Sequence, residues 1–86
     1  MPRVSEFYGI IIYMYYSEHG RPHFHAVYGD YEAIVAIRSL RVLDGRLPAR
    51  ALALVRAWAR IHGDELDANW ALARSGARLR PIAPLE

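Results

Sequence analysis

The sequence contains no cysteine, so disulfide bridges and thiolate metal ligands are both excluded. A chain without cysteine fits a reducing compartment, and we expect a cytoplasmic protein. The polar start of the chain lacks the apolar core of a signal peptide. The longest nearly apolar run, residues 7–16, falls far short of the about 20 residues that span a bilayer as a helix. We therefore expect no membrane segment.

Lysine is absent as well, and all eleven basic residues are arginine. Arginine presents a planar fork that suits carboxylates and phosphates. The formal net charge of +2 is too small to indicate nucleic-acid binding by itself. The chain also lacks repeats, linkers and low-complexity segments, so residues 1–86 are expected to form a single domain.

The two halves of the chain differ in their hydrophobic pattern, which predicts an α+β domain. Aromatic and β-branched residues predict strands between about residues 7 and 43, the first of them over residues 7–16. Helices are predicted between about residues 48 and 75, with a break at Gly63. The expected architecture is an antiparallel sheet of three to four strands with two helices packed on one face. An extended, proline-containing C-terminal tail over residues 77–86 completes it.

The Gly-Asp pair at residues 29–30 predicts a two-residue hairpin turn, because it lies between two strand-like runs. In the resulting register His25 lies opposite Ile34. One face of the hairpin is then apolar and should pack on the helices; it consists of Phe24, Ala26, Tyr28, Tyr31, Ala33, Val35 and Ile37. The opposite face, which carries His23, His25 and Glu32, is called the histidine face.

A longer loop, over residues 17–22, precedes this hairpin and leaves the pairing of the first strand less constrained. If Tyr16 lies near His23, then Ile12 and Met14 join the histidine face. That face would be too apolar for a monomer, which predicts that a homodimer or a protein partner covers it.

The histidine face gathers residue types that can carry chemistry. Two imidazoles, which titrate nearest neutral pH, lie side by side on one strand, and a further histidine lies just upstream. The candidate site residues are His23, His25, His19, Glu32, Tyr16 and Arg38.

Three interpretations of these residues are open. In the first, His23 and His25 are the acid and base of a reaction on RNA, and the other candidates orient them and stabilise charge. In the second, His19, His23 and His25 bind a metal, but their spacing matches no closed zinc pattern, so we expect no metal and no cofactor. In the third, the histidines are hydrogen-bonded and inert. Whether the chain is an enzyme stays open.

Several short motifs along the chain together resemble one family. They are Phe7-Tyr8-Gly9-Ile10, Glu18-His19-Gly20-Arg21-Pro22-His23-Phe24-His25, Tyr28-Gly29-Asp30-Tyr31, Leu43-Asp44-Gly45-Arg46-Leu47-Pro48, Trp58, Glu65-Leu66 and Asn69-Trp70. The chain is similar to the bacterial family of small proteins known as domain of unknown function 4160. The family's loop tends to read Asp-His-x-Pro-Pro-His-Phe-His, and here Glu18 and Arg21 stand at the first Asp and the first Pro.

The resemblance implies a bacterial, cytoplasmic protein with no established activity. Genes of this family are often paired with another small gene, in an arrangement similar to toxin–antitoxin modules. The leading hypothesis is a toxin–antitoxin-type module component that acts on RNA through the histidine face and has a partner encoded by the neighbouring gene. The alternative is a non-enzymatic interaction or regulatory protein whose histidine face docks a protein partner or a second copy of the chain.

Overall fold

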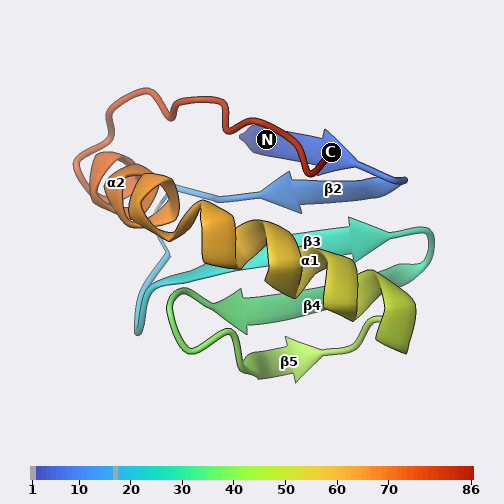
Figure 1. Ribbon diagram of the computed structural model, residues 1–86. Helices are drawn as coiled ribbons and strands as arrows, with labels where there is room; N and C mark the ends of the chain where they lie inside the picture. Colours follow the sequence, from blue (N-terminus) through green and yellow to red (C-terminus); the bar gives the residue numbers. More distant parts are fainter. Residues whose placement is uncertain (1, 17) are drawn as a thin grey trace.

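Five antiparallel strands form one sheet, and their order in the sheet is their order along the chain (Figure 1). The computed structural model describes residues 2–16 and 18–86. Its elements are β1 (Arg3–Phe7), β2 (Ile10–Tyr13), β3 (His23–Tyr28), β4 (Tyr31–Ala36), β5 (Val42–Gly45), α1 (Ala49–Ile61) and α2 (Gly63–Arg74). The α+β class is as predicted, but the sheet has five strands instead of three to four.

The additional strand follows from a turn that the sequence reading missed. A single strand is predicted over residues 7–16, but Tyr8 and Gly9 form a two-residue turn with φ of 50° and 78°. Positive φ at both central residues matches the twist of a β-hairpin. Tyrosine rarely adopts such a φ, so the residue types did not signal the turn. Phe7 and Ile10 consequently pair across the first hairpin.

The register of the β3–β4 hairpin is the one predicted from the turn at residues 29–30. His25 lies opposite Ile34, and side chains alternate between the two faces of a strand. Phe24 therefore points away from the histidine face, and its ring lies 5.9 Å from that of Trp58 in α1. The predicted helix-covered face is confirmed for Phe24, Ala26, Ala33 and Val35, which are fully buried. It is wrong for Tyr28 and Tyr31, which flank the turn and are 39% and 37% exposed.

The pairing of β2 with β3 differs from the expected one. Tyr13 lies opposite His25 and Ile12 opposite Ala26, so the odd-numbered residues of β2 share the histidine face. Ile12 and Met14 lie in the core, where they are 0% and 1% exposed. The predicted placement of Ile12 and Met14 on the histidine face is therefore wrong, and these residues give no reason to expect a homodimer or a partner over that face.

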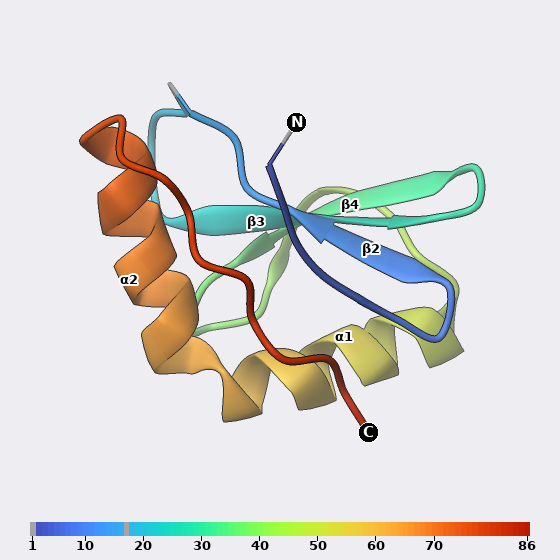
Figure 2. The same cartoon turned by 90° about the horizontal axis from the view of Figure 1, so that it is seen from above.

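The core lies between the sheet and α1 (Figure 2). Phe24 and Val35 from the sheet, and Val55 and Trp58 from α1, are fully buried. The helical period also places Ile61 near the arc of Trp58, but Ile61 is 68% exposed. Ile61 is the last residue of α1, where the chain turns away from the sheet into α2.

The second helix does not pack on the same face as α1. It rises past the end of the sheet at which β3 begins (Figure 2). Its Trp70 ring lies 5.0 Å from the ring of His23. The expectation that both helices cover the apolar face is corrected, because α2 reaches the histidine side of the sheet.

The C-terminal tail is extended and runs beside β1. The Ile82 N–H donates to the Val4 carbonyl at 2.7 Å. Asn69 of α2, which is 1% exposed, donates through Nδ2 to the Arg80 carbonyl at 2.8 Å and accepts from the Arg80 N–H at 2.9 Å. These bonds join the tail to both the sheet and α2.

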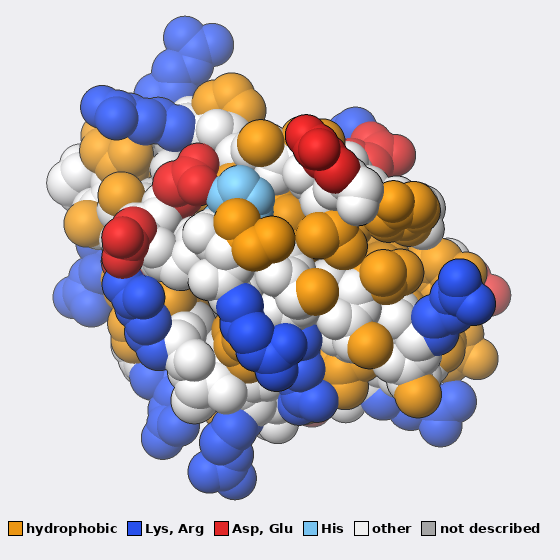
Figure 3. Space-filling view, in the orientation of Figure 1, with side chains coloured by type: hydrophobic (Ala, Val, Ile, Leu, Met, Phe, Trp, Pro, Cys, Tyr) orange, Lys and Arg blue, Asp and Glu red, His pale blue; other side chains and the backbone are white. Residues whose placement is uncertain are grey.

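Basic side chains are spread over the side of the molecule on which α1 lies (Figure 3). Arg50 and Arg60 are exposed, whereas Arg56 donates to the Leu40 carbonyl at 3.1 Å. Within residues 2–16 and 18–86, neither helix has the length and apolar character needed to cross a membrane.

Replacing Gly45 by alanine should destabilise the fold by about 2 kcal/mol or more. Gly45 has a φ of 71°, and a Cβ added there would overlap the carbonyl oxygen of Glu32 in the neighbouring strand. Urea unfolding checks this, with Gly29→Ala as the control: Gly29 has a φ of 58° but open space around it. Equal losses for the two variants would show that the close approach to Glu32 has no effect.

Candidate functional site

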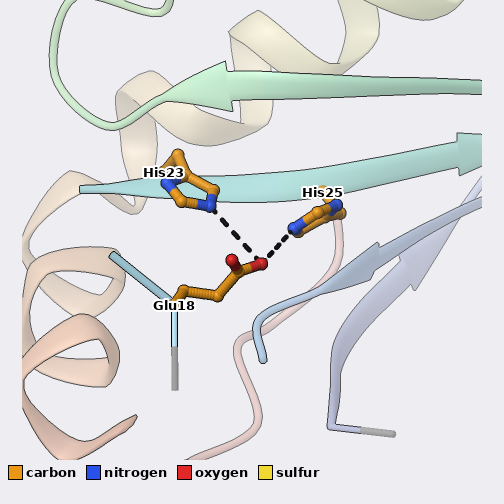
Figure 4. Close-up of side chains that lie close together, drawn as sticks. All are labelled: Glu18, His23 and His25. Carbon is orange, nitrogen blue, oxygen red and sulfur yellow. Dashed lines mark hydrogen bonds and ion pairs between the residues drawn. The ribbon is translucent and has the colours of Figure 1, made fainter. Parts of the chain in front are cut away.

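Three side chains converge on the histidine face (Figure 4). The Nε2 atom of His25 lies 2.7 Å from Oε1 of Glu18, and Nε2 of His23 lies 3.5 Å from the same oxygen. Both histidines come from β3, and Glu18 comes from the loop between β2 and β3. One carboxylate oxygen thus lies between two imidazoles. Glu18, His23 and His25 are called the histidine cluster.

The Nδ1 atoms of both histidines also have partners. Nδ1 of His23 lies 2.9 Å from the Arg21 carbonyl oxygen. Nδ1 of His25 lies 3.0 Å from Oε2 of Glu32. A carbonyl and an ionised carboxylate only accept hydrogen bonds, so both Nδ1 atoms carry a proton. Each ring is therefore fixed with its Nε2 atom directed at Glu18.

Aromatic rings shield the cluster from water. His23 and His25 are 8% and 9% exposed. The Trp70 ring contacts His23, and the edge of Tyr15 lies against His25 with ring centroids 4.6 Å apart. The side chain of Glu18 is 30% exposed, so it connects the buried imidazoles to solvent. Charges in such a setting interact more strongly than they do in water.

Hydrogen bonding within the cluster and burial beside it shift the pKa of Glu18 and of Tyr15. The hydrogen bond with His25 lowers the pKa of Glu18 and outweighs the opposing effect of burial. Burial, followed by the negative charge of Glu32, raises the pKa of Tyr15. At neutral pH we therefore expect an ionised Glu18 and a protonated Tyr15.

A hollow of about 250 Å³ lies next to the cluster. Glu18 forms part of its wall, so the hollow and the cluster share a side chain. The Tyr15 and Trp70 rings, which contact the two histidines, also line the hollow. The lining consists of Tyr15, Tyr16, Glu18, His19, Trp70, Ala73, Arg74 and Gly76.

The structure brings together three of the six residues that the sequence singled out. His23, His25 and Glu32 are in contact. His19 and Tyr16 are exposed and line the hollow, without a described contact to either imidazole.

Arg38 does not join this group. The sequence predicts a strand through Arg38, but β4 ends at Ala36, and Arg38 has a φ of 81°. The turn carries its guanidinium to α2, where it donates to Asp64 at 2.7 Å and to Asp67 at 2.8 Å. The expected role of Arg38 beside the histidines is therefore corrected.

Glu18 is the site residue that sequence reasoning missed. It precedes His19 in a loop, where no regular period predicts the direction of a side chain. The available signal was its position, since the family's loop tends to carry an acid there. The donor atoms of Glu18, His23 and His25 lie within 4.8 Å of one another and could hold a metal ion. This set contains Glu18 in place of His19, which the sequence reading named as the third ligand.

Comparisons with known proteins agree with the sequence resemblance. The family model described as domain of unknown function (DUF4160) matches residues 9–71, a span that includes the histidine cluster. No curated protein and no solved structure matches the chain. The site must therefore be interpreted from its own geometry.

Proposed function

This chain belongs to the DUF4160 family, and we propose that it acts on RNA as a component of a toxin–antitoxin-type module, with the histidine cluster as its reacting centre. One observation carries the proposal: two buried imidazoles meet one carboxylate oxygen beside a hollow lined by aromatic and cationic side chains. Perturbed, convergent ionisable groups next to a concave surface are typical of reacting centres.

The chemistry that fits these groups is cleavage of a phosphodiester bond through the ribose. A base takes the proton of the 2′-hydroxyl, whose oxygen attacks the adjacent phosphorus. An acid gives a proton to the 5′-oxygen that leaves, and the products are a 2′,3′-cyclic phosphate and a 5′-hydroxyl. We assign the base and acid roles to His23 and His25, and Glu32 orients His25 through Nδ1.

The hollow supports RNA as the substrate class. Unpaired bases stack on aromatic side chains, and arginine binds phosphate with its planar fork. The hollow offers the rings of Tyr15, Tyr16 and Trp70, together with Arg74 and His19. In this assignment Arg74 takes the charge-stabilising role that the sequence reading gave to Arg38, while Tyr16 and His19 contact the substrate.

The alternative, a non-enzymatic protein that docks a partner or a second copy through its histidine face, has less support. The apolar residues that predicted such a cover lie in the core. A partner encoded by the neighbouring gene is also compatible with the RNA proposal, in which it would be an inhibitor that covers the hollow.

The proposal is tested by incubating the purified chain with a labelled single-stranded RNA and with DNA of the same sequence. We expect cleavage of the RNA alone, because DNA lacks the 2′-hydroxyl that the base activates. RNA fragments should end in a 2′,3′-cyclic phosphate. Expression of the chain should arrest growth, and co-expression of the neighbouring gene should relieve the arrest. Intact RNA with unaffected growth, or equal cleavage of RNA and DNA, would contradict the proposal.

A further inference from the structure

We propose that Glu18, His23 and His25 form a binding site for one divalent transition-metal ion. The donors are Nε2 of both histidines and the carboxylate of Glu18. This inference goes beyond the proposed function, because it holds whether or not RNA is the substrate. It rests on the protons, the distances and the outer hydrogen bonds of the cluster.

The positions of the protons direct both Nε2 atoms of the cluster at one point. Both Nδ1 atoms donate outward, to the Arg21 carbonyl and to Glu32. Nε2 of His25 donates to the Glu18 carboxylate at 2.7 Å in the metal-free cluster. Metal binding displaces such a proton, because a histidine is deprotonated at the nitrogen that binds the ion. The ion then takes the place of that proton between Glu18 and the imidazoles.

The distances already approach those of a metal site. A tetrahedral zinc ion with bonds of about 2.0–2.1 Å holds its ligand atoms about 3.3 Å apart. In this structure Oε1 of Glu18 lies 2.7 Å from one Nε2 and 3.5 Å from the other. Glu18 is in a loop, whereas both histidines are on a strand. All the donor atoms lie within 4.8 Å of one another, so binding an ion requires the imidazole rings as well as the glutamate to move inward.

The outer hydrogen bonds follow the pattern of metal-binding histidines. Such histidines donate their second N–H to a backbone carbonyl or a carboxylate, which fixes the tautomer and makes the ligand nitrogen more basic. His23 uses the Arg21 carbonyl for this purpose, and His25 uses Glu32. Inert buried histidines require partners too, but they do not require that both remaining nitrogens point at one carboxylate oxygen.

The ligand set indicates which ions fit. Imidazole nitrogen with carboxylate oxygen suits zinc and its first-row neighbours better than calcium or magnesium. Three protein ligands leave a fourth position open, as in catalytic zinc sites. Glu18 borders the hollow, so that position is accessible to water or substrate. The metal-loaded protein would use both histidines as ligands, so the base and acid roles proposed above belong to the metal-free protein.

The test uses untagged full-length protein, freed of metal with EDTA and titrated with zinc chloride in a calorimeter. We expect about one zinc ion per chain, confirmed by elemental analysis after desalting. Zinc at about 100 times its Kd should raise the melting temperature by about 10 °C or more. His25→Ala and His23→Ala should lose stoichiometric binding. Glu32→Gln, an exposed position that is not a ligand, should bind zinc about 10–100-fold more weakly.

His19→Ala and His62→Ala are the matched controls, since they remove the two histidines that lie outside the cluster, and both should keep full binding. If His25→Ala does not fold, two other variants test the same site. Glu18→Gln removes the carboxylate ligand in the loop, and Glu32→Gln changes the exposed partner of His25 Nδ1. A wild type without zinc binding, or binding that survives His25→Ala, would overturn the inference. Binding lost in His19→Ala would also overturn it. The zinc titration contains no RNA, so it tests the metal site independently of the proposed substrate. Zinc binding by a protein that does not cleave RNA in the separate assay would reject the substrate and keep the metal site.

Discussion

Replacing His23 and His25 together by alanine should reduce the rate of RNA cleavage by about 10²–10⁴ or more, since each histidine moves a proton in the proposed reaction. Growth arrest on expression should disappear with the cleavage activity. Initial rates on labelled RNA, measured for wild type and the double variant at equal concentration, provide the comparison. The His23 ring contacts Trp70 and the His25 ring contacts Tyr15, so near-ultraviolet circular dichroism must show that the variant is still folded.

His62→Ala provides a matched control for this experiment. His62 is also a partly shielded histidine beside a glutamate, with Nδ1 2.5 Å from Glu65, but it lies between the helices and away from the cluster. Its loss should leave cleavage unchanged. A double variant that keeps its fold and cleaves at the wild-type rate would remove the histidine cluster from the reaction.

Trp58→Ala should have the largest effect on stability, about 3–5 kcal/mol. The Trp58 side chain is fully buried, its ring lies 5.3 Å from Phe7 and 5.9 Å from Phe24, and its Nε1–H donates to the Ala83 carbonyl. Truncation therefore removes contacts with the first strand, the histidine-bearing strand and the tail at once. Small domains have total stabilities near the low end of about 5–15 kcal/mol. Much of the variant should be unfolded at room temperature, as urea titration would show.

Ile61→Ala is the control on the same helix. Ile61 is 68% exposed, so its truncation should change stability by no more than about 0.5 kcal/mol. The two substitutions separate the effect of burial from any general effect on α1. Similar losses for both would mean that the helix is packed in another rotation about its axis.

The predictability of the fold depended on how each turn is encoded. The Gly-Asp turn at residues 29–30 uses residues that tolerate the required backbone, and it fixed the β3–β4 register down to His25 opposite Ile34. The turn at Tyr8-Gly9 demands the same positive φ from a tyrosine, which residue preferences do not anticipate. This one turn created an additional strand. Ile12 and Met14 lie in the core instead of on the expected surface because β2 pairs with β3 one residue away from the expected register.

The candidate site was predictable where it lies on a regular strand. Alternation along β3 placed His23 and His25 on one face, and the hairpin register brought Glu32 to them. Glu18 and Arg38 lie outside regular structure, where backbone dihedrals decide the direction of a side chain. Local composition does not determine these dihedrals, so the prediction omitted Glu18 and wrongly included Arg38.

The position of the C-terminal tail has a consequence for association between copies of the protein. A sheet has two edges, and edge-to-edge assembly needs both of them in order to propagate. Here the tail lies along the β1 edge, with Ile82 bonded to Val4, whereas β5 has no strand or tail on its outer side within the described residues. Strand pairing through β5 would join two molecules and then stop, because each has its other edge covered. The tail therefore limits such growth to a pair and protects the protein against fibre formation.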